Sequence, residues 1–192
     1  MKNKMIRVAI AALAFGGAAT ANAAFFDVAA VTNSSSGGVG LNTGIVLSAG
    51  QAFSVTAAAG DLWSAGALPR WSNADGLVAD LFATGSDDSG ESVGTKIGQE
   101  FVGGWTQNGL NAPFGSLVGK LASTYFFLGT NFAGPAPVAG TLSLYYWDSN
   151  NADNSGSVRA EVLVGQSVPE PIALSLVSIG LLGLGLTRRK RV

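Results

Sequence analysis

The chain has 192 residues, with eleven basic and twelve acidic side chains and neither cysteine nor histidine. The missing residue types exclude disulfides, Ser-His-Asp and Cys-His catalysis and the usual zinc sites, but not hard cations held by oxygen. Residues 24–167 contain eleven acids and four bases, which gives this segment a net charge of −7. That charge disfavours a nucleic-acid partner.

The N-terminus has the three parts of a secretory signal peptide. Basic residues within positions 1–7 precede a small and apolar run over 8–19, and Ala21-Asn22-Ala23 follows. This order predicts a signal helix over residues 1–23 and cleavage by signal peptidase between Ala23 and Ala24. The alternative is a retained membrane anchor, for which the run is short.

Residues 24–167 have the pattern of one all-β domain. Short runs rich in Val, Phe, Tyr, Thr and Leu alternate with Gly, Ser, Asn and Asp at spacings of about ten residues. The predicted strands are Phe25–Val31, Thr43–Leu47, Ala52–Ala57, Ser116–Leu121, Tyr125–Leu128, Thr141–Trp147 and Ser157–Val164. In the last, Val158, Ala160, Val162 and Val164 alternate with other residues, which predicts one core-facing side. Two such sheets packed face to face make a β-sandwich.

Two segments lack this pattern. Asp61–Asn111 places tryptophans among Gly, Ser, Asn and Asp, and we predict long functional loops there, with one strand near Glu100–Trp105. The run Ser34-Ser35-Ser36-Gly37-Gly38 is typical of a flexible turn or linker.

The C-terminus, residues 168–192, forms a separate unit. Val168-Pro169-Glu170-Pro171 precedes a predicted short apolar helix over 172–187, and the basic cluster Arg188-Arg189-Lys190-Arg191 follows. The apolar stretch from Ile172 to Leu186 would be about 22 Å long as a helix, shorter than an ordinary membrane span. The cluster should stay cytoplasmic, which puts the domain on the opposite side of the membrane.

This tail resembles the PEP-CTERM sorting signal of Gram-negative bacteria. The resemblance implies recognition near Pro169-Glu170-Pro171 by an exosortase, a transient stay in the inner membrane, and then transfer to the cell surface or extracellular matrix. A plain C-terminal anchor on a proline-rich stalk is the alternative.

The segment from Asp148 to Ser157 is rich in oxygen ligands. Two carboxylates and three carboxamides fall within seven residues between two predicted strands. Calcium takes six to eight oxygen ligands of these kinds, so a calcium site is one interpretation. An ordinary Asn/Asp-rich hairpin turn is the other.

Several motifs occur in the order found in the bacterial calcium-dependent galactose-binding lectins. They are Thr43–Leu47, Gly50–Ala57 with Gly60 and Trp63, Ala112–Lys120, Gly140–Leu144 and Asp153–Ser157. The chain resembles that family from about Val39 to Val164. The resemblance implies a jelly-roll-type, galactose-binding-like β-sandwich whose calcium coordinates two sugar hydroxyls directly.

The same resemblance assigns candidate residues. Asp148, Asp153 and Asn154 would be side-chain calcium ligands and sugar contacts. A backbone carbonyl of Asn150 or Asn151 would add a ligand, and another carbonyl would come from near Trp63–Gly66. A tryptophan, Trp63 or else Trp71 or Trp147, would pack on the sugar, although for each of them taken singly core or loop packing is the favoured interpretation. Residues 76–109 are an insertion relative to the family and can cover or remodel the site.

The sequence thus favours a non-enzymatic surface or matrix protein that binds neutral glycans or exopolysaccharide through calcium. A structural matrix protein with the same fold and no sugar site is the second hypothesis. A polysaccharide hydrolase is the third, and it lacks a recognisable nucleophile or carboxylate pair.

Overall fold

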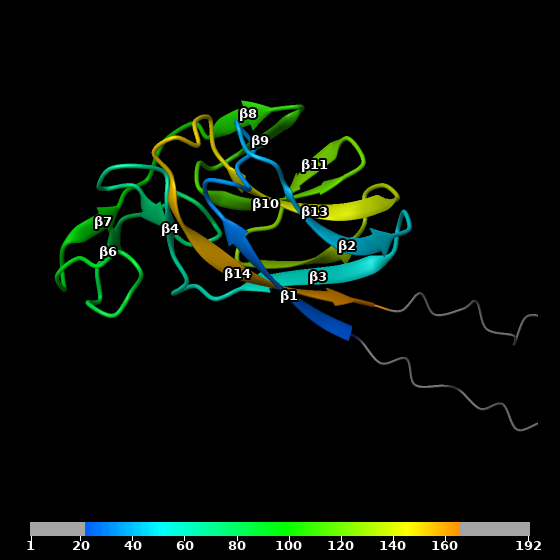
Figure 1. The fold of residues 1–192 in the computed structure, drawn as a ribbon, viewed down its shortest axis with the longest axis horizontal. Helices are drawn as coiled ribbons and strands as arrows, with labels where there is room; N and C mark the ends of the chain where they lie inside the picture. Colours follow the sequence, from blue (N-terminus) through cyan, green and yellow to red (C-terminus); the bar gives the residue numbers. More distant parts are fainter. Residues whose placement is uncertain (1–21, 166–192) are drawn as a thin grey trace, which may run out of the picture.

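The structure, a computed structural model, describes residues 22–165, and all regular elements in this range are β-strands (Figure 1). The strands are β1 (Asn22–Ala29), β2 (Leu41–Leu47), β3 (Ala52–Ala57), β4 (Trp63–Ser64), β5 (Trp71–Ser72), β6 (Leu81–Phe82), β7 (Lys96–Gly98), β8 (Trp105–Gln107), β9 (Leu110–Ala112), β10 (Ser116–Leu121), β11 (Thr124–Phe127), β12 (Asn131–Pro135), β13 (Gly140–Trp147) and β14 (Ser155–Val164). The predicted C-terminal helix lies outside the described residues, as does the signal helix apart from Asn22 and Ala23, which begin β1.

Strand β14 organises the larger sheet. β1 pairs with it from Asn22 to Ala29, opposite Val164 to Ser157. β3 and β4 follow one another along the other side, and the order β12-β3-β14-β4-β5 completes the six-stranded sheet. This pairing places the short strand β4 beside the start of β14, where the loop from β13 enters.

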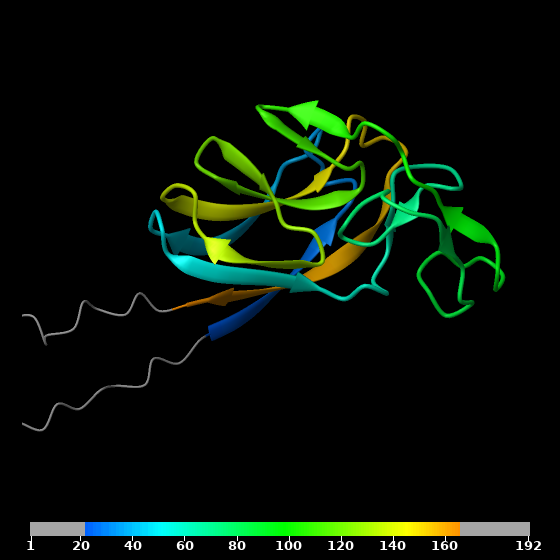
Figure 2. The same ribbon diagram turned by 180° about the vertical axis from the view of Figure 1, so that it is seen from behind.

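The smaller sheet has the order β11-β10-β13-β2, and every pair in it is antiparallel. Its inner face packs on that of the larger sheet, which makes the domain a β-sandwich (Figures 1 and 2). Fully buried residues from both sheets form the core between them: Val28, Val55, Val158, Ala160 and Val162 from the larger sheet, and Leu117, Leu121, Leu142, Leu144 and Tyr146 from the smaller one.

The sandwich agrees with the sequence prediction. The seven predicted strands correspond to β1, β2, β3, β10, β11, β13 and β14, and the bounds of β3 and β10 are the predicted ones. Val158, Ala160 and Val162 are buried as expected from their alternation, and Val164 packs at the margin of the core. Strand β12 was not predicted, because its Gly134 and Pro135 are poor strand formers. β12 lies at the edge of its sheet, where a proline is tolerated.

The prediction for the middle of the chain was wrong in detail. Residues 61–111 contain six short strands, β4 to β9, and the strand expected near Glu100–Trp105 begins only at Trp105. The β8–β9 hairpin packs on the outer face of the smaller sheet, around Val118 and Trp147. The β6–β7 hairpin forms a small lobe around Ile97, at the end of the molecule away from the two termini (Figures 1 and 2).

The two ends of the described chain leave the domain together, because β1 and β14 are antiparallel neighbours (Figure 1). β14 has ten residues, which spans about 33 Å at the usual rise of a strand. The loop at the start of β14 is therefore at the opposite end from both exits. No helix within residues 22–165 has the length and apolar character needed to cross a membrane.

Candidate functional site

A pocket of about 220 Å³ lies where β13 ends and β14 begins. One wall is the acidic loop, which we define as residues 148–154. A second wall is the β4–β5 turn, with Ala65 and Arg70. A third wall is apolar and consists of Leu77, Phe101 and Phe114. The pocket thus lies between the sandwich and the segment that holds the short strands.

The acidic loop is held in place by the Ser34–Ser36 segment. Ser35 Oγ donates to the carbonyl of Asp148 at 3.0 Å, and Ser36 Oγ donates to that of Ser149 at 2.8 Å. The backbone of Ser35 also donates to Tyr146 O at 2.8 Å, and Ser34 is fully buried. The predicted turn is present over Ser35–Gly37, but it is not a flexible linker, because these residues run alongside the end of β13 and bond to it.

Asp148 is the buried carboxylate of the loop, with 4% of its surface exposed. Its Oδ1 accepts the amide of Ser149 at 2.8 Å. Burial raises the pKa of the Asp148 carboxyl, and hydrogen bonds from Ser149 and from the Asn154 side chain oppose that rise. Among the described residues no basic side chain pairs with Asp148. The fold thus buries an anion that lacks a counterion.

Asn154 is also buried, at 7% exposed. Its Nδ2 donates to the carbonyl of Ala30 at 3.1 Å, which fixes the amide. Its Oδ1 is buried and has no hydrogen-bond donor in the described part of the chain. An unsatisfied buried oxygen costs on the order of 1–3 kcal/mol. Asn154 is, however, not among the residues that line the pocket.

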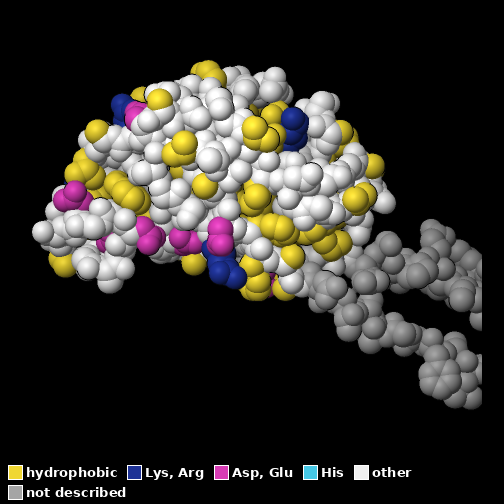
Figure 3. Space-filling model, viewed as in Figure 1, with side chains coloured by type: hydrophobic (Ala, Val, Ile, Leu, Met, Phe, Trp, Pro, Cys, Tyr) yellow, Lys and Arg dark blue, Asp and Glu magenta, His cyan; other side chains and the backbone are white. Residues whose placement is uncertain are grey.

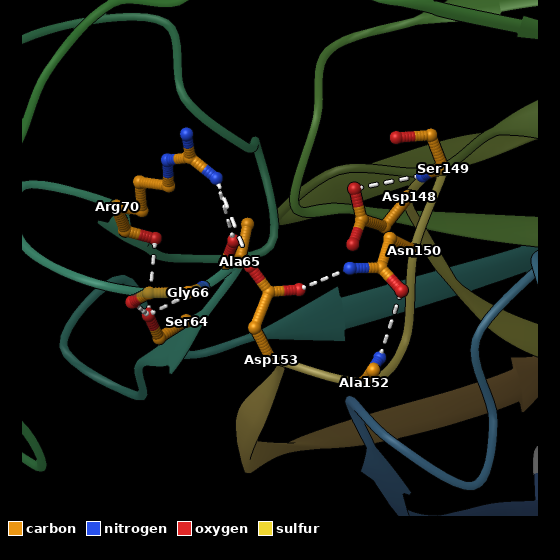
Figure 4. Close-up of polar contacts among 9 residues, drawn as sticks. All are labelled: Ser64, Ala65, Gly66, Arg70, Asp148, Ser149, Asn150, Ala152 and Asp153. Atoms are coloured by element: carbon orange, nitrogen blue, oxygen red, sulfur yellow. Dashed lines mark hydrogen bonds and ion pairs between the residues drawn. The ribbon is translucent and has the colours of Figure 1, made fainter.

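Asp153 belongs to the acidic loop, and its carboxylate lies between Asn150 of that loop and the β4–β5 turn (Figure 4). Its Oδ1 accepts Asn150 Nδ2 at 2.8 Å, and its Oδ2 lies 3.8 Å from Arg70 Nη1. The same Arg70 atom donates to Ala65 O at 3.5 Å. Gly66 permits this approach, since a Cβ there would lie 2.6 Å from Asp153 Oδ2 and its φ of 126° favours glycine. Both contacts of Arg70 are long, so it holds these oxygens only weakly.

The pairing of β4 with β14 brings Ala65 to the pocket. Ser155 is opposite Ser64, and Gly156 is opposite Trp63. A carbonyl from the Trp63–Gly66 stretch therefore lies beside the acidic loop, the neighbourhood from which the lectin resemblance draws a ligand. Asp148, Asn150 and Asp153 line the same pocket.

Two candidate residues are placed elsewhere. Asn151 Nδ2 donates to Val31 O at 3.3 Å, and its side chain lies beside Gly37 rather than in the pocket. Trp63 is fully buried, with Nε1 donating to Gly115 O at 2.7 Å and its ring against Tyr146. The expectation that Trp63 packs on a sugar is therefore wrong, because no face of its ring is exposed.

The sequence analysis did not single out Arg70, Phe101 or Phe114. Phe101 is an aromatic residue in a Gly-rich part of the 76–109 insertion, which was the one available signal. A hydrolase would need a pair of carboxylates, but Asp80, Glu100 and Glu161 lie at three different pockets, so the described structure does not pair them.

The donor set of the pocket is made of oxygen. Within residues 22–165 no three His, Cys, Asp or Glu side chains cluster as metal ligands. A cation in the pocket would depend on two carboxylates, Asp148 and Asp153, and on carbonyl oxygens such as that of Ala65, whereas Asn154, the third predicted side-chain ligand, is not among the lining residues. Calcium accepts such mixed oxygen ligands, whereas zinc prefers nitrogen and sulfur.

Comparison with known proteins gives one informative likeness. No protein-family profile matches the sequence, and no curated protein matches it either. One solved structure with a similar fold carries the description "EclA N-terminal domain; PllA-like lectin". It is 20% identical, with a TM-score of 0.45, and the match covers 74% of this chain and 95% of the other. Similarity at this level does not identify a ligand for this chain.

Proposed function

We propose that the exported domain is a lectin-like protein that binds neutral glycans through calcium, and that it is not an enzyme. The observation that carries the proposal is the buried Asn154 Oδ1, which lacks a donor next to a buried Asp148 that lacks a counterion. A buried polar atom without a partner needs an explanation in a native fold, and an ion held at the acidic loop would supply one. Both belong to the stretch that the lectin resemblance assigns to calcium.

The residues fit calcium in number and kind. Asp148, Asp153, Asn154 and the Ala65 carbonyl would hold the ion, with a further carbonyl expected from Asn150 or Asn151. A calcium ion bound there supplies open coordination positions for two vicinal sugar hydroxyls. Asn150, already bonded to Asp153, lines the pocket and can hydrogen-bond a hydroxyl. Ser34–Ser36 keep the loop rigid, which lowers the ordering cost of binding.

Arg70 must give up its contacts when a cation binds. It now touches Asp153 Oδ2 and Ala65 O, two of the proposed ligands. Half of its side chain is exposed, so it can turn to solvent at little cost.

We further propose that the sorting tail delivers this domain to the cell surface or extracellular matrix of a Gram-negative bacterium. The proposal rests on the PEP-CTERM resemblance of residues 168–192, which lie outside the described residues. The position of the pocket supports it, because the chain leaves β14 at the end opposite the acidic loop (Figure 1). A domain tethered there would face its pocket away from the attachment point.

Acidic side chains gather along one edge of the face in Figure 3 and basic ones are sparse, which disfavours nucleic acid as a partner.

The test is retention of the full chain, purified in mild detergent, on beads that carry galactose, glucose, mannose or N-acetylglucosamine. Retention on at least one sugar is expected in millimolar calcium and loss of retention in a chelator. Asp153→Asn should abolish retention. Asp27→Asn removes an equal charge from exposed β1 and should not change retention. Equal retention in calcium and in chelator contradicts the calcium-dependent function.

A further inference from the structure

Phe101 is an aromatic side chain exposed at the same pocket. It lies between β7 and β8 in the 76–109 insertion, and 49% of its surface is exposed. It faces a cavity whose other walls are the acidic loop and the β4–β5 turn. Single exposed hydrophobic residues are common on protein surfaces. This one is distinguished because it lines the same pocket as Asp148, Asn150 and Asp153.

The ring is fixed although it is half exposed. The Phe101 amide donates to Leu77 O at 2.9 Å, and the Leu77 amide donates to Phe114 O at 2.8 Å. The Phe101 and Phe114 rings meet edge to face, with centroids 5.1 Å apart and planes at 76°. Leu77 is buried in the main core. The insertion is thereby tied to the sandwich at the pocket, and the aromatic wall is preformed.

We propose that Phe101 is the aromatic contact for the apolar face of the bound sugar and thereby determines specificity. The inference rests on the proposed function and adds the ligand class. A pyranose ring has hydroxyls at its edge and C–H groups on a face, so it needs a polar wall and an aromatic wall. The pocket is lined by both kinds of group, the carboxylates of Asp148 and Asp153 and the ring of Phe101. Its volume of about 220 Å³ suits one sugar ring rather than a chain of them.

This assignment replaces the buried Trp63 as the aromatic contact. Trp147 is fully buried too, with Nε1 donating to Trp105 O at 2.8 Å. Phe25, Phe82 and Phe127 are exposed, but none of them lines this pocket. Phe114 also lines the pocket, but its side chain is half-buried and its ring packs edge to face against that of Phe101. The preferred ligand is therefore a hexopyranose with an uninterrupted C–H face on one side and vicinal hydroxyls for the acidic loop.

The test compares three variants of the full chain, Phe101→Leu, Phe101→Tyr and Phe82→Leu. Phe82 is the matched control, because it lies in the same insertion, is 53% exposed and is outside the pocket. The probe is the immobilised sugar that retains the wild-type chain, among galactose, glucose, mannose and N-acetylglucosamine, with affinity measured by surface plasmon resonance. Phe101→Leu should bind roughly three- to tenfold more weakly, while Phe101→Tyr and Phe82→Leu should stay within about twofold of wild type.

A calcium measurement separates this inference from the function on which it rests. All three variants should keep the thermal shift that calcium gives the wild-type chain, since none removes a proposed ligand. If Phe101→Leu binds the sugar as tightly as wild type, the Phe101 assignment is wrong and the calcium-dependent function stands. If the wild-type chain binds none of the four sugars in calcium, the proposed function and this inference are both overturned.

Discussion

The sandwich and the segment from β4 to β9 are built in different ways. Apart from β4 and β5, the strands of the two packed sheets have four to ten residues, and their inner side chains form one large buried cluster. The strands between residues 63 and 112 have two or three residues, and the two smaller buried clusters associated with them have three buried members each. Val78, Val93 and Val102 remain exposed in that segment. We infer from this difference that the stability of the fold resides mainly in the sandwich.

The pocket lies at the junction of these two regions. The sandwich contributes the acidic loop at the end of β13, whose buried Asp148 lines the pocket. The irregular segment contributes Ala65, Arg70 and Phe101. Changes on the irregular side should therefore alter binding with little loss of stability, whereas changes in the sandwich core should alter stability first.

The largest expected effect is in the sandwich core. Leu144→Ala removes a fully buried side chain from the centre of β13 and should lower the free energy of unfolding by about 3 kcal/mol. Ile97→Ala removes an equally buried side chain from the small β6–β7 cluster, where the surroundings can collapse, and should cost about 2 kcal/mol or less. Urea unfolding of both variants measures the difference. A greater loss of stability in Ile97→Ala than in Leu144→Ala would contradict the inference that stability resides mainly in the sandwich.

A smaller effect of opposite sign is expected at Tyr146, next to the junction. Its hydroxyl is buried without a hydrogen-bond partner in residues 22–165, and burial raises its pKa well above the ordinary value. Tyr146→Phe removes that unsatisfied group and should stabilise the fold by about 1 kcal/mol. Tyr125→Phe is the control, since Tyr125 is half exposed and its change should stay within about 0.5 kcal/mol. A clear loss of stability in Tyr146→Phe in the same urea experiment contradicts this account.

The smallest effect on stability is expected at Arg70. Its pair with Asp153 is long and half exposed, so Arg70→Gln should change unfolding by less than about 0.5 kcal/mol. The same change removes a positive charge beside the proposed ligands and should tighten calcium binding by roughly fivefold. Calcium titrations of the two proteins at equal ionic strength provide the measurement. Weaker calcium binding in Arg70→Gln would show that Arg70 supports the site rather than competing for it.

The sequence predicted the sandwich well because its strands bury one side, and that burial leaves a period of two residues. The short strands β4 to β9 form only because other strands pair with them. With two or three residues each, they are too short for an alternation of buried and exposed side chains to be recognised in the sequence. The hydrogen bonds of the Ser34–Ser36 segment to the acidic loop could not be predicted for a related reason. The composition of this segment suits a turn, and only the fold brings Ser35 to Asp148, 113 residues later.

Only the polar residues of the site could be predicted from the sequence. Asp148, Asp153 and Asn154 are close in sequence, and the lectin resemblance singles them out. The burial of Asp148 and the unsatisfied Asn154 oxygen depend on tertiary packing. Phe101 reaches the pocket through contacts with Leu77 and Phe114, from a segment with no regular pattern. Trp63 was wrongly predicted to contact a sugar because it lies in a polar stretch of the sequence. Its burial depends on the pairing of β4 with β14, which the sequence does not indicate.

The most direct test of the calcium site is a calorimetric titration of calcium into the full chain and its Asp153→Asn variant. Asp153 is half exposed, so the variant should fold normally and report on binding alone. The account predicts one calcium ion bound per wild-type chain in the millimolar range or tighter, and affinity at least about tenfold weaker in Asp153→Asn. Wild-type protein that takes up no calcium, or a variant that binds it equally well, would contradict the account.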